Sequence, residues 1–290
     1  MRGLPIVALR LLSALPLAGT PLLVSLALVP LAGCAPKGAK SSLEYSEDAK
    51  RAYEEAMEEF RAHNWLESQT LFREVKKNYA YSKYARLAEL RIADADFEQD
   101  KFAEAVRQYR DFVSNHRADN EGVAYARSRT AEAQYLQAGG DGIFAAPSDE
   151  RDQAVILDAY RELRNYLGDY PNAGASARAR ELLGNVTARL IRHELVVARF
   201  YLNRDNYGAT VSRIKYALRT YGSVGASNDP IVVDSGLEPE CLLLLGETYL
   251  RMEQWADARD AFVTLLRDYG ASSLTDPAKR FLAYMDSRGV

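Results

Sequence analysis

Residues 65–79 read WLESQTLFREVKKNY, and this stretch decides the fold. A large apolar residue, Trp65, is followed by a small residue after three positions, a large one after seven and an aromatic one after fourteen. Steps of three, four and seven place these residues on one stripe of a helix, and the small residue lets a neighbouring helix approach closely. The stretch therefore predicts an amphipathic helix packed against a partner helix.

The same spacing returns four more times, and each gap has room for a second helix, such as 84–97. We call these sets frames; they start 37, 54, 51 and 48 residues apart, whereas the tetratricopeptide repeat that they resemble has a period of about 34. Repeated helix pairs stack into a solenoid. We therefore expect an all-α superhelical solenoid of five divergent tetratricopeptide-like helix pairs, closed by a helix that opens at Asp276-Pro277. The frames are Trp65/Ser68/Phe72/Tyr79, Phe102/Ala105/Tyr109/His116, Ile156/Ala159/Leu163/Tyr170, Tyr207/Thr210/Ile214/Tyr221 and Trp255/Ala258/Phe262/Tyr269.

Residues 1–33 differ in kind from the rest. Arg2 and Arg10 precede a run rich in Leu, Ala and Val that contains three prolines and ends in small residues. This order predicts a signal peptide. A transmembrane anchor is the alternative, but three prolines argue against a retained helix.

The run ends in Leu31-Ala32-Gly33-Cys34, which resembles the bacterial lipoprotein signal. The resemblance implies that Cys34 carries a covalent diacylglycerol and an N-acyl chain such as palmitate, and becomes the first residue of the mature protein. Ala35, in place of Asp, implies lipid anchoring at the periplasmic face of the outer membrane. No other cofactor and no metal is expected.

Charge and cysteine content narrow the possible functions. Loss of Arg2 and Arg10 changes the net charge from −3 to −5, so bulk charge gives no reason to expect nucleic acid as a partner. If Cys34 carries lipid, Cys241 is the remaining cysteine and no intrachain disulfide can form. Cys241 opens an apolar stretch, and we interpret it as a small core residue and not as a nucleophile.

The remaining chain divides by composition. We expect a lipidated tether over 34–46, with Ser46 as the cap of the first helix. N-terminal repeats should follow over 47–137, on the substrate side, and C-terminal repeats over 151–290, on the partner-docking side. A Gly-rich loop insertion over 138–150 separates the two sets of repeats. Within the insertion, Ile143-Phe144 either folds back on the solenoid or forms a partner hook. An unusually long helix is expected from Ala175 to about Asn203, whose periodic residues can share one face: Leu182, Val186, Leu190, His193, Val197 and Phe200.

Around this long helix the charge balance is inverted. Between Arg178 and Arg219 there are nine basic residues and three acidic ones, a local charge of +6. Either the arginine stems cover apolar helix surface, or the arginines form a docking face for an acidic partner domain. The residues predicted for that face are Arg189, Arg192, Arg199 and Arg204.

Catalytic motifs are missing from the sequence. His193-Glu194 resembles the start of a zinc-protease motif, but Val197 stands where the second His is required. His116 occupies a frame position that is Tyr in the other four copies, which indicates packing. The sequence therefore predicts a protein that is not an enzyme.

The order of these features resembles the BamD family of outer-membrane protein assembly lipoproteins, most clearly over 64–95 and 170–221. The resemblance implies a non-enzymatic scaffold whose C-terminal repeats bind the periplasmic domains of BamA, beside other Bam lipoproteins. Its N-terminal repeats would receive unfolded outer-membrane β-barrel precursors, in a groove near Tyr53, Phe60, Tyr84 and Phe97. Gly222, in place of the expected proline, and the long loop after it depart from the family pattern.

Two other classes of function remain open from the sequence. A periplasmic tetratricopeptide adaptor lipoprotein for cell-wall or pilus machinery would share the fold and the anchor but would not bind BamA. An enzyme built on helical repeats would need catalytic residues that the motif search does not find.

Overall fold

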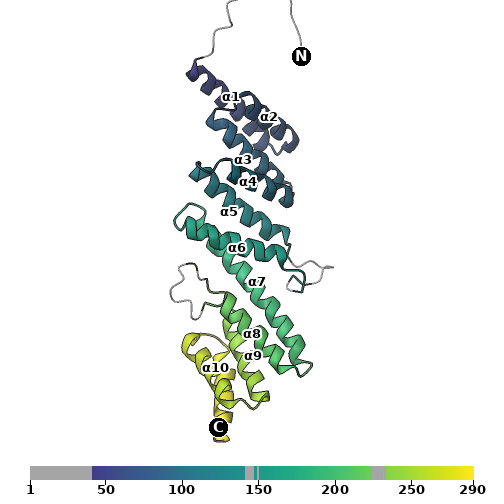
Figure 1. Cartoon of the computed structure of the whole chain (residues 1–290), viewed down its shortest axis with the longest axis vertical. Coiled ribbons are helices and arrows are strands. Elements are labelled where there is room, and N and C mark those ends of the chain that lie inside the picture. Colours follow the sequence, from purple (N-terminus) through teal and green to yellow (C-terminus); the bar gives the residue numbers. More distant parts are fainter. Residues whose placement is uncertain (1–40, 141–146, 149, 224–230, 232) are drawn as a thin grey trace, which may run out of the picture. The chain divides into compact units, whose positions relative to one another are not determined.

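In the computed structural model, residues 41–140, 147–148, 150–223, 231 and 233–290 are described, and within them the chain forms eleven helices and no strands. Each helix packs against the next in chain order, and α1, α3, α5 and α7 also touch in succession (Figure 1). The helices are α1 (Ser42–Arg61), α2 (Trp65–Asn78), α3 (Lys83–Glu98), α4 (Phe102–Asn115), α5 (Asn120–Gln137), α6 (Ala154–Asp169), α7 (Ser176–Leu202), α8 (Tyr207–Tyr221), α9 (Glu238–Arg251), α10 (Trp255–Asp268) and α11 (Thr275–Ser287).

The five frames coincide with the five even-numbered helices. The small residue of every frame has an exposed fraction of 0%, which shows that a neighbouring helix does approach at that point; these residues are Ser68, Ala105, Ala159, Thr210 and Ala258. The aromatic or histidine that ends each frame lies at the end of its helix, as the C-cap or, for Tyr221, as the last residue. The predicted solenoid of five helix pairs with a closing helix is confirmed.

The turn inside a pair is built in the same way four times. Each has one residue in the left-handed region, with φ between 56° and 60°, two positions before the frame begins: His63, Asp100, Asp205 and Glu253. The amide of the following residue donates to the carbonyl five positions earlier, as from Asn64 to Glu59 at 2.9 Å. This is the hydrogen bonding of a Schellman-type helix end. In the third pair the 138–150 insertion stands between α5 and α6, and it too has a left-handed residue after the helix end, Gly139 with a φ of 65°.

Close helix contact in the last pair depends on Gly246 of α9. A Cβ atom at this position would lie 2.4 Å from Cε1 of Phe262 in α10, well inside van der Waals contact. Phe262 is itself fully buried and cannot retreat without opening the core. The pair Gly246 and Phe262 therefore sets the distance between α9 and α10.

The start of α1 differs from the prediction. The helix begins at Ser42, and Ser41, not Ser46, is its N-cap. The Ser41 hydroxyl accepts from the Glu44 amide at 3.2 Å, and the Glu44 carboxylate accepts from the Ser41 amide at 2.9 Å. This reciprocal capping box satisfies two amides that the helix leaves free, so residues 42–46 are helical and do not belong to the tether. Cys34 and Ile143-Phe144 lie outside the described residues.

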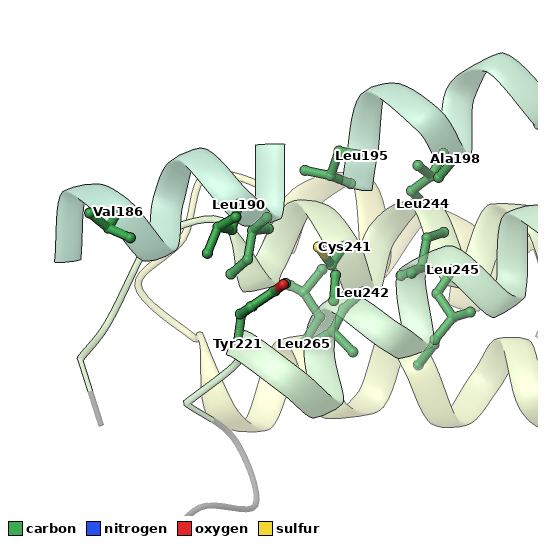
Figure 2. Close-up of a cluster of buried hydrophobic side chains, with 14 of the residues drawn as sticks. Val186, Leu190, Leu195, Ala198, Tyr221, Cys241, Leu242, Leu244, Leu245 and Leu265 are labelled. Atoms are coloured by element: carbon green, nitrogen blue, oxygen red, sulfur yellow. The ribbon is translucent and has the colours of Figure 1, made fainter. Parts of the chain in front are cut away.

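The long helix predicted over 175–203 is confirmed as α7, whose 27 residues include Leu195 and Ala198 of the C-terminal core. This core runs from α5 to α11 as one cluster, whereas the N-terminal pairs have two smaller clusters. Cys241 of α9 lies in it with an exposed fraction of 0% (Figure 2). The interpretation of Cys241 as a core residue is confirmed.

Cys241 is expected to resist thiol reagents in the folded protein. Burial, aided by the negative charges of Glu238 and Glu240, raises the pKa of the Cys241 thiol to about 12. The thiolate is the reactive form, and at pH 8 it amounts to about one molecule in ten thousand. With Cys34 changed to Ser, an aromatic disulfide reagent should therefore react with less than one thiol per chain over hours and with one on unfolding in urea. Rapid reaction of the native chain would contradict this.

Candidate functional site

A groove with a volume of about 430 Å³ lies between α3 and α5 in the N-terminal repeats. Its basic side chains are Lys83, Arg86 and Arg91, and its apolar part is formed by Leu87, Leu90 and Tyr125. Asp119 at its edge pairs with Arg86, at 3.2 Å between Oδ2 and Nε. Apolar walls with a few polar groups are typical of a site that binds a peptide segment, and the three cations of the lining outnumber its two acids, Asp119 and Glu121.

Asp94 of α3 fixes the orientation of two residues of this groove. Its carboxylate accepts from Arg91 Nη1 at 2.5 Å and from the Tyr125 hydroxyl at 2.9 Å, and it also accepts from the Tyr109 hydroxyl of α4. Arg129 of α5 adds an ion pair at 3.8 Å. The Asp94 side chain is only 3% exposed, so these donors replace its hydration.

The tyrosines around Asp94 act as hydrogen-bond donors over the whole physiological range. Burial, and then the charge of Asp94, raise the pKa of Tyr125 to about 12. Burial and Asp94 also raise the pKa of Tyr109. Arg91 donates through Nε to the Tyr53 hydroxyl at 3.3 Å, which connects the Asp94 network to α1.

A second acid of α3, Asp96, connects this helix to α2 and α4. It accepts from Gln69 Nε2 of α2 at 2.8 Å and from Gln108 Nε2 of α4. The sequence analysis assigned no role to either acid. A signal was present, because Asp94 and Asp96 alternate with alanines inside the helix predicted over 84–97, where a solvent-exposed acid would be expected on one face only.

Of the four predicted peptide-binding aromatics, three lie together and one does not. Tyr53, Phe60 and Tyr84 surround Phe72 in the first core cluster, with ring centroids of Tyr53 and Tyr84 5.6 Å apart. Phe97 belongs to the next cluster, where its ring centroid lies 5.4 Å from that of Phe102. All four fill seams between helices, and the groove beside them is lined by other residues of α3 and α5. Their peptide-binding role stays a prediction.

Arg189 has a place in the fold that separates it from the other predicted docking arginines. It is 6% exposed, and its guanidinium donates to the Gly139 carbonyl at 2.7 Å and to Gln153 Oε1 at 3.2 Å. It therefore holds the described ends of the connection between α5 and α6. A docking face needs accessible guanidinium groups, so the face considered below omits Arg189.

The other three arginines are exposed along α7 and just beyond its end. Arg192 and Arg199 are seven residues apart, two helical turns, and Arg199 pairs with Glu240 of α9. Arg204 stacks on Phe200, with its guanidinium carbon 3.6 Å from the ring centroid, and donates to the Phe200 carbonyl at 3.2 Å. We call Arg192, Arg199, Phe200 and Arg204 the α7 face.

Phe200 was predicted on the buried stripe of the long helix, and this was wrong, because its exposed fraction is 50%. In the first part of the helix the buried residues of the stripe are Leu182, Val186 and Leu190. Further along the helix the buried residues are Leu195, Ala198 and Leu202. An aromatic side chain kept at the surface under an arginine is typical of residues that dominate protein–protein interfaces.

Comparison with known protein families assigns the chain to one of them. The model of a family described as outer membrane lipoprotein, YfiO, matches residues 45–233, well over half of the sequence. The chain belongs to the YfiO family. A tetratricopeptide-repeat model also matches residues 240–272, which include nearly all of α9 and all of α10.

Several YfiO-type relatives carry the name outer membrane protein assembly factor BamD, which confirms the predicted resemblance. The protein of Caulobacter vibrioides is 27% identical over 76% of this chain and 66% of its own length, so the match spans just under two thirds of that relative. Those of Xylella fastidiosa and Neisseria gonorrhoeae are 22% and 26% identical, over 77% and 69% of this chain and 73% and 76% of their own lengths.

The YfiO match covers both the α3–α5 groove and the α7 face. In the described ranges, no group of His, Cys, Asp and Glu side chains is arranged to hold a metal ion. A search of the same residues for membrane-spanning helices finds none with the necessary length and hydrophobicity. The α3–α5 groove and the α7 face are the candidate surfaces of this YfiO-family chain.

Proposed function

We propose that this YfiO-family protein is a non-enzymatic scaffold of outer-membrane protein assembly, which binds BamA through the α7 face and unfolded β-barrel precursors through the α3–α5 groove. The observation that carries the proposal is the family match, which spans both surfaces, together with relatives named outer membrane protein assembly factor. We further propose that lipid on Cys34 holds the protein at the periplasmic face of the outer membrane, since several acyl chains anchor a protein firmly.

The chemistry of the α7 face suits an acidic partner domain. Arg204 can keep its stack on Phe200 and still offer donors to a carboxylate, because a guanidinium carries five N–H groups in a planar fork. Phe200 supplies the apolar contact that such an interface needs at its centre. Phe200 lies on α7, and Arg204 is held against it by the stack and by its hydrogen bond to the Phe200 carbonyl, so little conformational entropy is lost on binding.

The groove suits an extended precursor segment that contains an aromatic residue. Leu87 and Tyr125 provide apolar contact for a ring, and Lys83 and Arg86 provide cations for a carboxylate. The Asp94 network holds Arg91 and Tyr125 in place before any ligand arrives. Such pre-organisation favours binding of a flexible partner, which must itself be ordered.

The first test is capture of purified BamA periplasmic domains by the full lipidated chain in detergent. Changing Arg192, Arg199 and Arg204 to Glu should weaken binding by at least about tenfold, because like charges would meet across the interface. The matched control changes Arg61, Lys77 and Arg107 to Glu, exposed residues of α1, α2 and α4, and alters the net charge by the same amount. Equal loss in both variants, or none in the first, would remove the α7 face from the proposal.

The same parent chain, incubated with detergent-extracted outer membrane, separates the proposal from the adaptor alternative. Recovery of BamA with the chain supports the role in outer-membrane protein assembly. Recovery of cell-wall or pilus proteins in its place would favour the adaptor function.

A peptide titration tests the groove. A labelled peptide with an aromatic residue near its carboxyl end should bind the parent chain, and it should bind less tightly when Lys83 is changed to Glu and Leu87 to Ser. Lys77→Glu with Leu66→Ser is the control, because Leu66 is 78% exposed on α2.

A further inference from the structure

A pocket with a volume of about 350 Å³ lies in the C-terminal half of the fold, where α6, α7 and the end of α8 meet. Its polar lining comes from Tyr160 and Arg164 of α6, Thr187 of α7, and Arg219 and Tyr221 of α8. None of these residues belongs to the α3–α5 groove or to the α7 face. The volume is that of a small-ligand site and would accept one amino-acid residue.

Thr187 gives the pocket an unusual polar group. The side chain is 2% exposed, and its hydroxyl has no hydrogen-bond partner among the described residues. Other buried threonines of this chain donate to the carbonyl four residues earlier, Thr130 at 2.8 Å and Thr248 at 2.7 Å. A buried hydroxyl without a partner is rare in native proteins, and a group bound in the pocket that Thr187 lines would supply one.

The charges around the pocket select an anion. Two arginines, Arg164 and Arg219, line it, and none of the described lining residues is acidic. Arg164 donates to the Tyr160 hydroxyl at 3.4 Å, and that hydroxyl donates to the Thr220 carbonyl at 3.3 Å, which fixes the phenol at the rim. The rings of Tyr160 and Tyr221 meet edge to face, with centroids 5.5 Å apart. On the side of the rim formed by Tyr160 and Arg164, the side chains are therefore held by their neighbours.

The remaining walls are apolar and come from Leu183, Ile231 and Val233. A compact inorganic anion would leave these walls without contact, whereas a carboxylate carried by an apolar group would use both parts of the pocket. We infer that the pocket binds a carboxylate attached to an apolar residue, with Arg219 and the Thr187 hydroxyl as donors. The carboxylate can come from a peptide terminus or from an acidic side chain. The inference does not depend on the proposed assembly function.

The test uses calorimetric titration of the full chain with four small compounds. N-acetylphenylalanine carries a terminal carboxylate, its amide carries none, acetylglutamate with an N-methylamide end carries a side-chain carboxylate, and inorganic phosphate lacks an apolar part. We expect at least one of the two carboxylates to bind and the amide not to bind. The carboxylate compound that binds more tightly shows whether the natural carboxylate comes from a peptide terminus or from an acidic side chain. No binding of either carboxylate at about 10 mM, equal binding of the amide, or equally tight binding of phosphate would overturn the inference.

Two variants locate the binding. Arg219→Gln and Thr187→Val should each weaken carboxylate binding by about tenfold, whereas Arg192→Gln on the same pair of helices should not. Thr187→Val should melt at the same temperature as the parent or higher, because an unpartnered hydroxyl is replaced by a methyl group of similar size. Unchanged carboxylate affinity in both variants would overturn the assignment. Arg219→Gln should leave capture of BamA unchanged, so failure of this inference and failure of the proposed function are distinguishable.

Discussion

Replacing Asp94 with alanine is expected to lower the free energy of unfolding by about 3–5 kcal/mol, the loss typical of removing one partner of a buried ion pair. The carboxylate receives Arg91, Tyr109 and Tyr125, and all four side chains come from α3, α4 and α5. Without it, Arg91 loses its ion-pair partner and two hydroxyls lose their acceptor. Asp94→Asn should cost less, because the amide oxygen still accepts one hydroxyl.

Urea unfolding followed by circular dichroism measures this effect. Asp111→Ala is the matched control, because Asp111 is an exposed acid of α4 that has no ion pair among the described residues, and its loss should change stability by no more than about 0.5 kcal/mol. Precursor-peptide binding should fall with Asp94→Ala even in urea-free buffer, since Arg91 and Tyr125 line the groove. Equal stability of the Asp94 and Asp111 variants would show that the network does not hold these helices together.

Phe262→Ala is expected to lower the free energy of unfolding by a similar amount, about 3–5 kcal/mol, and to destabilise mainly the helices around the ring. The ring is fully buried, meets Gly246 of α9 and stacks on Phe281 of α11, with centroids 5.1 Å apart and an interplanar angle of 9°. Its loss leaves a cavity between three helices at the end of the solenoid. Because each repeat contacts only its neighbours, the damage should stay near α9, α10 and α11.

Hydrogen exchange read by mass spectrometry distinguishes local from global loss. Amides of α9 to α11 should exchange markedly faster in Phe262→Ala, while those of α1 to α4 keep their protection. Val263→Ala, one position along and 44% exposed, should leave exchange unchanged. Uniformly faster exchange along the whole chain would mean that the solenoid unfolds as one unit.

The sequence predicted the helix pairs well because their signal is local. A frame such as Trp255/Ala258/Phe262 fixes which face is apolar and where a neighbour can approach, and both properties follow from helical spacing alone. The capping box of Ser41 and Glu44 was equally local and was overlooked, so the first helix was predicted to start too late. That error was one of interpretation and not a limit of the sequence.

The candidate surfaces were less predictable, because they depend on contacts between distant residues. Asp94 draws its donors from three helices, and Arg189 reaches a carbonyl 50 residues away, so composition shows neither. Counting arginines found the charged region but could not separate Arg189, which serves the fold, from Arg204, which is exposed. Phe200 was misplaced because the buried stripe of a 27-residue helix shifts around its axis as the neighbours change.

The four turns with a left-handed residue also show what the repeats have in common. His63, Asp100, Asp205 and Glu253 share a backbone conformation and a hydrogen-bonding pattern, yet they are of three residue types and none is the glycine that this conformation favours. The four turns thus share a backbone conformation and not a residue type. In the third pair the same place after the helix end is taken by Gly139, with a φ of 65°, so the left-handed conformation is kept even where the insertion begins.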